Sequence, residues 1–344
     1  MTANTRQRRV QLLRQPDGGH RLTVEEAPMP VPAAGEVLVR VHAAALNRRD
    51  VYVLKGQYPM PPRPQLVPLS DGAGEVVAIG SAVRRFQPGD PVAASFFQRW
   101  IGGRPAADFL SSALGGQLDG MLSDYVCLSE DGLVSIPEGY SFEEAATLPC
   151  AAVTAWNGLL SRGRMKPGDN VLILGTGGVA IFGLQFAVAA GGRPIVISSS
   201  DSKLARATEL GAAASINYSN NPQWAELVRA ATGGVGVHQI LEVGGRGTLQ
   251  QSLASLAAGG HVALIGGLAG FGGDIPAMTL LQANATASGI YVGSRADFEA
   301  MNAFIERHKV RPVIDRVYEF ADAAAAYERL ESGRHFGKVV IRLR

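Results

Sequence analysis

The segment from Asn170 to Gly192 constrains the fold of this chain more than any other. An apolar strand, 171–174, leads into a glycine turn and then into a helix with an apolar face. Gly175, Gly177 and Ala180 match the GxGxxG/A pattern, in which a helix N-terminus carries the pyrophosphate of a dinucleotide. The pattern predicts a dinucleotide site that also includes Thr176, Gly178 and Val179. The alternative is an ordinary glycine-rich turn between a strand and a helix.

Short apolar strands and helical stretches alternate between Cys150 and about Val292. This alternation predicts a parallel, doubly wound sheet, and therefore an α/β fold. The strands are expected at 171–174, 194–198, 214–216, 237–242 and 261–265, and the helices at 178–190, 201–210, 222–231 and 247–257.

The rest of the chain has a different texture. Residues up to about 137 are rich in β-strand patterns, with strands expected at 37–41, 74–79 and 90–94. Ser141 and Glu144 form a capping-box pattern at a helix start. After Gly293, helices are expected at 295–307 and 321–331, and a strand at 338–343. This tail is short for a separate domain. We therefore expect a first domain of 1–149 completed by 293–344, and a dinucleotide-binding domain of 150–292.

Composition restricts the partners. The chain of 344 residues has a net charge of +2, with 47% hydrophobic and 18% charged residues. These values are typical of a globular protein and do not favour nucleic-acid binding. Arg6, Arg8 and Arg9 are expected in a solvated tail, and no signal sequence or membrane-spanning run is predicted. With two cysteines only, Cys127 and Cys150, we expect a reduced, cytoplasmic protein.

The end of the second strand of the sheet indicates which dinucleotide is preferred. A carboxylate at this place binds the ribose 2′-hydroxyl of NAD. The chain instead has Ser198, Ser199 and Ser200 there, and Lys203 shortly afterwards. Serines do not repel a 2′-phosphate, and a lysine pairs with it. The sequence therefore favours NADP(H), with Ser198, Ser199 and Lys203 near that phosphate. The alternative for Lys203 is an ordinary solvent-facing lysine.

Six motifs in a fixed order resemble those of the medium-chain dehydrogenase/reductase superfamily. They cover almost the whole chain and are LNRRD (46–50), SDGAGEVVAIG (70–80), QPGDPV (87–92), ATLPCAAVTAW (146–156), KPGDNVLILGTGGV (166–179) and HFGKVVI (335–341). Within it, the chain resembles the zinc-free quinone oxidoreductase-like branch, which includes zinc-type alcohol dehydrogenase-like proteins. The resemblance implies a GroES-like β-barrel domain, a Rossmann domain, and an active site in the cleft between them.

The chain departs from the zinc-binding members of this superfamily at the ligand positions. Asn47 stands where the first cysteine is expected, and Leu69-Ser70-Asp71 stands in place of Gly-His-Glu. Cys150 alone falls where a ligand is expected. A catalytic zinc needs three protein ligands, so no zinc or other metal is predicted.

Without a metal, the simplest substrates are those that spread negative charge by conjugation. Quinones and α,β-unsaturated carbonyls do so, because hydride addition gives a hydroquinone anion or an enolate. The resemblance implies catalytic roles for Asn47, Asp50 and Tyr52, which form an NxxDxY pattern. Tyr52 or Tyr58 would donate a proton or a hydrogen bond. The alternatives are that Asp50 only starts a helix and that the tyrosines only line the pocket.

Further positions carry over from the resemblance. Simple core or loop packing is the alternative for each cofactor contact. The implied cofactor contacts are Thr154, Tyr218, Gly266, Leu268, Ile290, Val292, Phe336 and Lys338. The expected substrate pocket includes Tyr58, Ser70, Cys150, Phe96, Phe97 and Trp100. The last three are aromatic residues of one long loop, so a loop that packs on itself is an equal alternative.

The sequence thus predicts an NADP(H)-dependent, zinc-independent oxidoreductase of the quinone reductase type. A metal-free alcohol or carbonyl dehydrogenase is the first alternative. A binding protein that senses NADPH with little catalysis is the second. By analogy with the superfamily we also expect a homodimer, in which 286–292 forms an edge strand of the Rossmann sheet.

Overall fold

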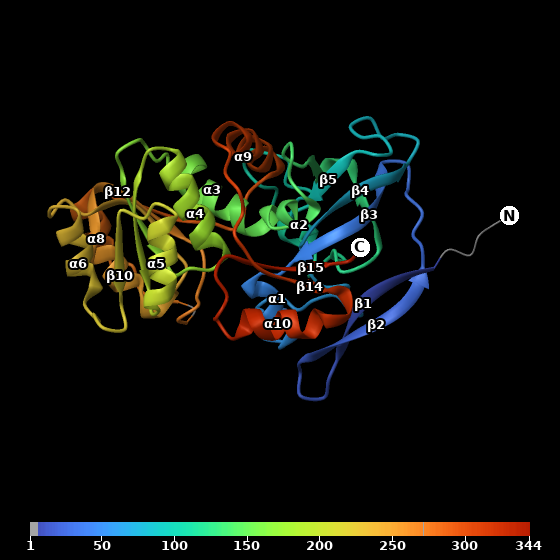
Figure 1. Ribbon diagram of the computed structural model, residues 1–344, viewed down its shortest axis with the longest axis horizontal. Coiled ribbons are helices and arrows are strands. Elements are labelled where there is room, and N and C mark those ends of the chain that lie inside the picture. The colour runs from blue at the N-terminus through green and yellow to red at the C-terminus, as the bar shows by residue number, and fades with distance from the viewer. Residues whose placement is uncertain (1–5, 271) are drawn as a thin grey trace. The chain divides into compact units, whose positions relative to one another are not determined.

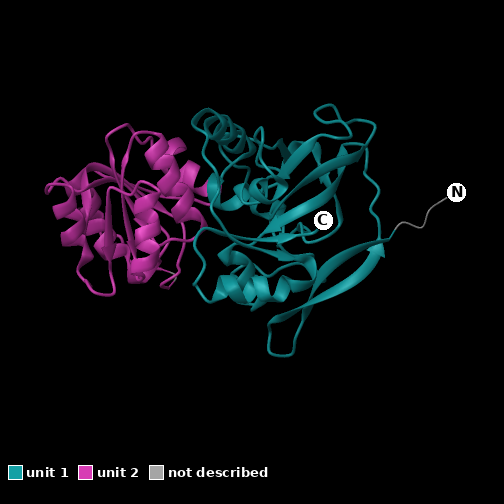
Figure 2. Cartoon of the chain, in the orientation of Figure 1, with its two compact units in different colours: residues 1–153, 293–344 teal, residues 154–292 magenta. Residues whose placement is uncertain are grey.

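The computed structural model describes residues 6–270 and 272–344. They form two compact units (Figure 2). Unit 1 consists of residues 1–153 and 293–344, and unit 2 of residues 154–292. The short helix α3, Val153–Trp156, contains the first boundary between them. No helix of the described residues is long and apolar enough to cross a membrane.

Unit 2 is built around a parallel sheet in which β10 and β12 are labelled in Figure 1. The six strands have the order β10-β9-β8-β11-β12-β13. The chain runs outward from β8 on one side and then returns to start β11 on the other. The turn after β8 therefore lies at the point where strand order reverses, the usual place for a ligand in such sheets. The elements are β8 Asn170–Leu174, α4 Gly178–Ala189, β9 Arg193–Ser198, α5 Asp201–Glu209, β10 Ala214–Asn217, α6 Trp224–Ala231, β11 Val237–Glu242, α7 Leu249–Ala254, β12 Leu256–Leu264, α8 Ala277–Ala283 and β13 Thr286–Gly289.

The sequence predicted every strand of this sheet, but it missed helix α8, and one helix boundary was wrong. The helix expected at 247–257 is α7, which ends at Ala254, and β12 already begins at Leu256. The apolar face of α7 packs into the core of the unit through Leu249 and Leu253, and Leu256 joins the same core from the strand. The helix and the following strand both place apolar residues in the same core. The hydrophobic pattern alone therefore does not mark the last residue of the helix.

Unit 1 contains a β-sheet of order β14-β15-β3-β4-β5-β7, to which β6 adds by pairing with β3, and a separate hairpin of β1 and β2. The core lies between the sheet and α10, with Val39, Leu46 and Ile341 among its fully buried members. The elements are β1 Arg6–Arg14, β2 His20–Pro28, β3 Glu36–Ala45, α1 Arg48–Leu54, β4 Asp71–Ile79, β5 Pro91–Ala94, β6 Tyr125–Ser129, β7 Leu133–Ser135, α2 Phe142–Ala145, α9 Arg295–His308, β14 Ile314–Glu319, α10 Ala323–Glu331 and β15 Lys338–Arg342.

The N-terminal arginines are not in a solvated tail, so that prediction was wrong. Arg6, Arg8 and Arg9 belong to β1, which pairs with β2 along its whole length. Arg8 donates two hydrogen bonds to the carboxylate of Asp124, at 3.2 and 2.9 Å. Val10, Gln11 and Leu12 of the same strand are buried, so β1 is anchored to the rest of the unit.

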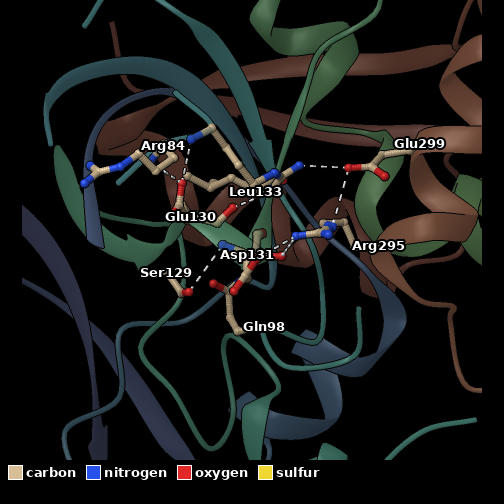
Figure 3. A network of polar contacts seen from close by, with 10 residues as sticks. Arg84, Gln98, Ser129, Glu130, Asp131, Leu133, Arg295 and Glu299 are labelled. Carbon is tan, nitrogen blue, oxygen red and sulfur yellow. Dashed lines mark hydrogen bonds and ion pairs between the residues drawn. The ribbon is translucent and has the colours of Figure 1, made fainter. Parts of the chain in front are cut away.

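The segment after Gly293 belongs to unit 1 and is tied to it through α9. Arg295 donates to Asp131 Oδ1 at 2.9 Å, and Arg85 donates to Glu299 at 2.9 Å (Figure 3). The backbone amide of Arg295 also donates to the carbonyl of Trp100 at 2.9 Å. The two ion pairs are exposed and contribute little each, but together with the backbone bond they fix where the returning chain begins.

Candidate active site

The glycine turn of unit 2 has the geometry that a dinucleotide requires. Gly175 has φ +81°, in the left-handed region that favours glycine. Its amide donates to the carbonyl of Ile197 at 2.7 Å, which holds the turn against β9. Gly177 precedes α4, whose first backbone N–H groups lack acceptors within the helix. These groups and the positive end of the helix dipole fit a pyrophosphate.

The predicted cofactor contacts of unit 2 fall into two environments. Ser198 ends β9 and is buried, and Tyr218 and Leu268 are exposed. Thr154, Ile290 and Val292 are buried. Val292 has φ +57°, which is costly for a β-branched residue, and its carbonyl accepts a hydrogen bond of 2.7 Å from Asn157 Nδ2. Strained backbone of this kind is typical of functional sites.

Strand register in unit 1 brings together residues that are far apart in the sequence. β15 pairs with β3 so that Val340 lies opposite Ala45, and Leu46 N donates to Val339 O at 3.0 Å. Continuing this register places Lys338 beside Asn47. On the other side of β3, Asp71 of β4 lies opposite Ala45. The ends of three strands therefore meet at one place.

Four side chains there form a closed ring of hydrogen bonds, which we call the polar ring: Lys338, Asn47, Ser70 and Asp71. Lys338 Nζ donates to Asn47 Oδ1 at 2.6 Å, and Asn47 Nδ2 donates to Ser70 Oγ at 3.5 Å. The Ser70 hydroxyl donates to Asp71 Oδ1 at 2.7 Å. Lys338 Nζ closes the ring at 3.5 Å from Asp71 Oδ2. All four residues are buried.

Two backbone features hold the polar ring in place. The amide of Cys150, in a π-helical turn spanning Leu148–Ala152, donates to Asp71 Oδ2 at 3.2 Å. Leu69, immediately before Ser70, has φ +70° although it is not glycine. It is fully buried, and Met121 N donates to its carbonyl at 2.8 Å. Strained backbone and a π-helical turn are both common at functional sites.

The residues at the expected metal positions do not fit zinc. Asn47 offers a neutral amide, and the Asp71 carboxylate already accepts from a hydroxyl, an amide and an ammonium. Burial raises the pKa of the Cys150 thiol, and the nearby Asp71 charge raises it further. The Lys338 ammonium also repels a dication. Among residues 6–270 and 272–344, no group of three or more His, Cys, Asp or Glu side chains is arranged to hold a metal ion.

Asp50 lies beside the polar ring and differs from Asp71. It sits in the first turn of α1, where its Oδ2 accepts a hydrogen bond of 2.7 Å from Asn47 N. Its Oδ1 is buried without a partner among the described residues. Burial raises the pKa of Asp50 to about 6, although the positive charge of Arg49 opposes the rise. The helix-start role weighed from the sequence is therefore present, together with a strongly perturbed carboxyl group.

Sequence reasoning missed Arg49. Its guanidinium is buried, lies 4.7 Å from the ring centre of Phe96 and 5.3 Å from that of Tyr58, and donates to Leu114 O at 2.7 Å. A Cβ atom on Gly116 would lie 2.1 Å from Nη2, so a larger residue there would displace the guanidinium. The only sequence signal was an arginine inside the NxxDxY motif, which gives no hint of burial.

The aromatic residues of the long loop pack mainly on one another. Phe96 and Phe97 have ring centres 4.7 Å apart, and Trp100 lies 5.4 Å from Phe109. Phe96, Phe97 and Trp100 are all buried. The loop therefore packs on itself, and a role of these residues in a substrate pocket stays a prediction.

Two tail residues that the resemblance assigns to the cofactor, Phe336 and Lys338, lie in unit 1. Phe336 is buried, and its amide donates to Asp315 Oδ1 at 3.1 Å. Lys338 directs its ammonium to the polar ring and to Leu46 O at 2.8 Å. Tyr52 of α1 is half-buried, and the Arg48 guanidinium is 5.3 Å from its ring centre.

Comparison with known proteins agrees with this architecture. Residues 33–138 match the model of the alcohol dehydrogenase GroES-like domain, and residues 178–307 match that of the zinc-binding dehydrogenases. A zinc-type alcohol dehydrogenase-like protein of Schizosaccharomyces pombe is 47% identical over 334 residues, which cover 95% of this chain and 96% of that protein.

Solved structures extend the likeness. A putative alcohol dehydrogenase of Sinorhizobium meliloti superimposes with a TM-score of 0.93 at 39% identity, covering 100% of both chains. A quinone oxidoreductase of Pseudomonas syringae superimposes with a TM-score of 0.82 at 28% identity, covering 98% of this chain and 100% of that one. The expected α/β fold, with a GroES-like domain and a Rossmann-like parallel sheet, is thereby confirmed. The chain belongs to the medium-chain dehydrogenase/reductase superfamily, a family of oxidoreductases that bind a nicotinamide cofactor.

Proposed function

We propose that this protein is an NADP(H)-dependent, zinc-independent oxidoreductase that transfers hydride to quinones or α,β-unsaturated carbonyls. The observation that carries the proposal is the polar ring, in which Asn47 and Asp71, at two of the expected ligand positions, are both bonded to the Lys338 ammonium. Zinc enzymes use the metal to stabilise a localised alkoxide. A site that offers the substrate a hydrogen-bond donor instead of a metal suits substrates that delocalise the negative charge themselves.

The chain's own residues bind and polarise the substrate in this proposal. A reduced nicotinamide supplies the hydride when bound, and the backbone of the Gly175–Val179 turn holds its pyrophosphate. Hydride addition to an enone or a quinone moves an electron pair onto the carbonyl oxygen. Asn47 Nδ2 donates to that oxygen, since its amide oxygen is occupied by Lys338. A proton from solvent then completes the reduction.

The preference for NADP(H) rests on the charges at the end of β9. Ser198 and Ser200 replace the carboxylate that would bind an NAD ribose, and the nearest acid, Asp201, accepts a 2.7 Å hydrogen bond from Asn217 Nδ2. Lys203 lies in the first turn of α5, where its amide is held by Ser200 Oγ. The serines in place of a carboxylate and the positive charge of Lys203 favour binding of a 2′-phosphate.

Steady-state rates with NADPH and NADH, on a panel of quinones, enones, simple ketones and alcohols, test the proposal. We expect the highest kcat/KM with NADPH and a quinone or an enone, and at least a tenfold lower value with NADH. Faster turnover of ketones or alcohols would instead support the alcohol or carbonyl dehydrogenase alternative. Tight NADPH binding without turnover of any substrate would support a sensor.

We also propose that the protein forms a homodimer through unit 2. β13 is the edge strand of the six-stranded sheet and leaves one side open for pairing. The neighbouring helix α8 exposes Met278 and Leu281 to solvent. An unpaired edge beside exposed apolar side chains is a typical site of self-association. Analytical ultracentrifugation should give twice the monomer mass, and Leu281→Glu should shift the protein toward monomer.

A further inference from the structure

Lys338 is a buried charge whose donors are all used inside unit 1. The residue is 2% exposed, and its ammonium donates to Leu46 O, Asn47 Oδ1 and Asp71 Oδ2. An ammonium has three N–H groups, so this set is complete. A charge is kept in a protein interior only when paired and hydrogen-bonded, because its desolvation is costly. The three acceptors therefore form a binding site for one cation, which we call the cradle.

The cradle determines which way the Asn47 amide faces. The two ends of an amide have nearly the same shape, but only the oxygen can accept a hydrogen bond from an ammonium. Lys338 therefore turns Oδ1 inward and Nδ2 toward Ser70. Without the ammonium, Leu46 O and Asp71 would remain as acceptors on the inner side. They would attract the NH₂ group and reverse the amide.

We propose that Lys338 is a positioning residue that fixes Asn47 as a hydrogen-bond donor and polarises it. A hydrogen bond accepted by the amide oxygen strengthens the N–H donor at the other end, because hydrogen bonds in a chain reinforce one another. The charge of Lys338 thus reaches the substrate oxygen through Asn47 without direct contact. This inference rests on the proposed function and deepens it, since it assigns the electrostatic part of the site to a residue predicted to contact the cofactor.

The main test separates orientation of Asn47 from simple stabilisation of the fold. Lys338→Met alone leaves Asp71 buried without its cation, so loss of folding would obscure the result. The double variant Lys338→Met/Asp71→Asn removes both charges and keeps a neutral interior. We expect the double variant to recover thermal stability relative to Lys338→Met but to keep a kcat at least about 100-fold below wild type, the range seen when one donor to a developing oxyanion is lost.

Conservative and matched variants sharpen this result. Lys338→Arg keeps a cationic donor and should recover part of the kcat. Asn47→Asp keeps the bond to Lys338 but offers no N–H, so it should lose kcat as the double variant does. Lys55→Met is the control, because Lys55 pairs with Glu331 on the surface of the same unit and should leave kcat unchanged. A double variant that regains both stability and kcat would overturn the proposal, because the ring would then be only structural.

Two further measurements separate this inference from its rivals. Fluorescence titration should give the double variant an NADPH Kd within about twofold of wild type. A tenfold rise in Kd with unchanged kcat would show direct cofactor contact and overturn the proposal. A double-mutant cycle in the Asp71→Asn background, with Asn47→Ala and Lys338→Met, should show at least tenfold coupling in the unfolding equilibrium constant. This cycle needs no substrate, so it tests the bond between Lys338 and Asn47 even if the proposed reaction fails, and additive effects would contradict that bond.

Discussion

The glycine turn of unit 2 and the polar ring of unit 1 are built in opposite ways. The turn is one continuous segment whose working groups are backbone amides and a glycine with φ +81°. The polar ring consists of charged and polar side chains from three distant segments, brought together by the register of β3, β4 and β15. A backbone site depends on local geometry, whereas a buried side-chain site depends on mutual charge compensation. The two sites should therefore respond differently to substitution.

The largest effect is expected from breaking the charge pair of the polar ring. Asp71→Ala leaves the Lys338 ammonium buried without its carboxylate, which costs about 3–5 kcal/mol of unfolding free energy. Chemical denaturation measures this loss. Glu331→Ala is the control, because it breaks a partly exposed lysine pair and should cost less than about 1 kcal/mol. Equal losses in both variants would contradict the idea that burial makes the polar ring sensitive.

Asp50→Asn tests the effect of burying a carboxylate without partners. One carboxylate oxygen of Asp50 accepts no hydrogen bond from the described residues, whereas both oxygens of Asp71 accept at least one. The pKa of Asp50 rises from 3.8 to about 6 in the folded protein, so folding disfavours the charged form. Asp50 therefore contributes to the unfolding free energy of the wild-type protein below pH 4, and this contribution is lost as the pH rises to 6. A shift of about 2 units corresponds to about 3 kcal/mol. Asparagine should therefore stabilise the protein by up to that amount above pH 6 and not at all near pH 4.

Denaturation series at several pH values check this prediction. The amide oxygen of asparagine keeps the hydrogen bond from Asn47 N, so the comparison isolates the charge. A difference between variant and wild type that is the same at pH 4 and pH 7 would mean that Asp50 is not a perturbed acid.

Gly175→Ala breaks the glycine turn and leaves the polar ring intact. No atom lies within 4 Å of the added Cβ, so the cost is only that of a left-handed backbone, about 1–2 kcal/mol. We expect NADPH Kd to rise about tenfold, as measured by fluorescence titration. Asn284→Gly, at another left-handed position of unit 2, is the control and should leave Kd unchanged. An unaltered Kd for Gly175→Ala would show that the turn does not hold the cofactor.

Lys203→Ala is expected to have the smallest effect, because the charge is at the surface. Loss of its attraction for the 2′-phosphate should raise the KM for NADPH about fivefold and leave that for NADH unchanged, a free-energy difference of about 1 kcal/mol. Steady-state kinetics with both cofactors measures it. Equal changes for the two cofactors would remove Lys203 from 2′-phosphate recognition.

The same contrast explains what the sequence could predict. The strand, glycine turn and helix at 170–192 follow local rules of hydrophobic pattern and backbone geometry, and the structure has them where expected. The capping box of Ser141 and Glu144 is equally local and is present, with Ser141 Oγ accepting from Glu144 N. Asn47, Ser70 and Asp71 could be named as candidate site residues because of their places in the family motifs.

The polar ring itself could not be predicted, because it depends on long-range register. Asn47 and Lys338 are 291 residues apart, and only the pairing of β15 with β3 shows that they touch. Likewise, the strand expected at 74–79 begins at Asp71, and those three extra residues place the carboxylate beside Ala45. Arg49 was missed for a similar reason, since its burial depends on a glycine loop 65 residues away.

Metal dependence tests the central claim most directly. The zinc content of the purified protein is measured first. The protein is then dialysed against a strong chelator, and NADPH oxidation by a quinone is followed with and without added zinc. We predict less than about one zinc per ten chains, full activity after dialysis, and no activation by added zinc, because Asn47 and Asp71, at two of the expected ligand positions, are bonded to the Lys338 ammonium. Stoichiometric zinc, or activity lost on dialysis and restored by zinc, would contradict the account.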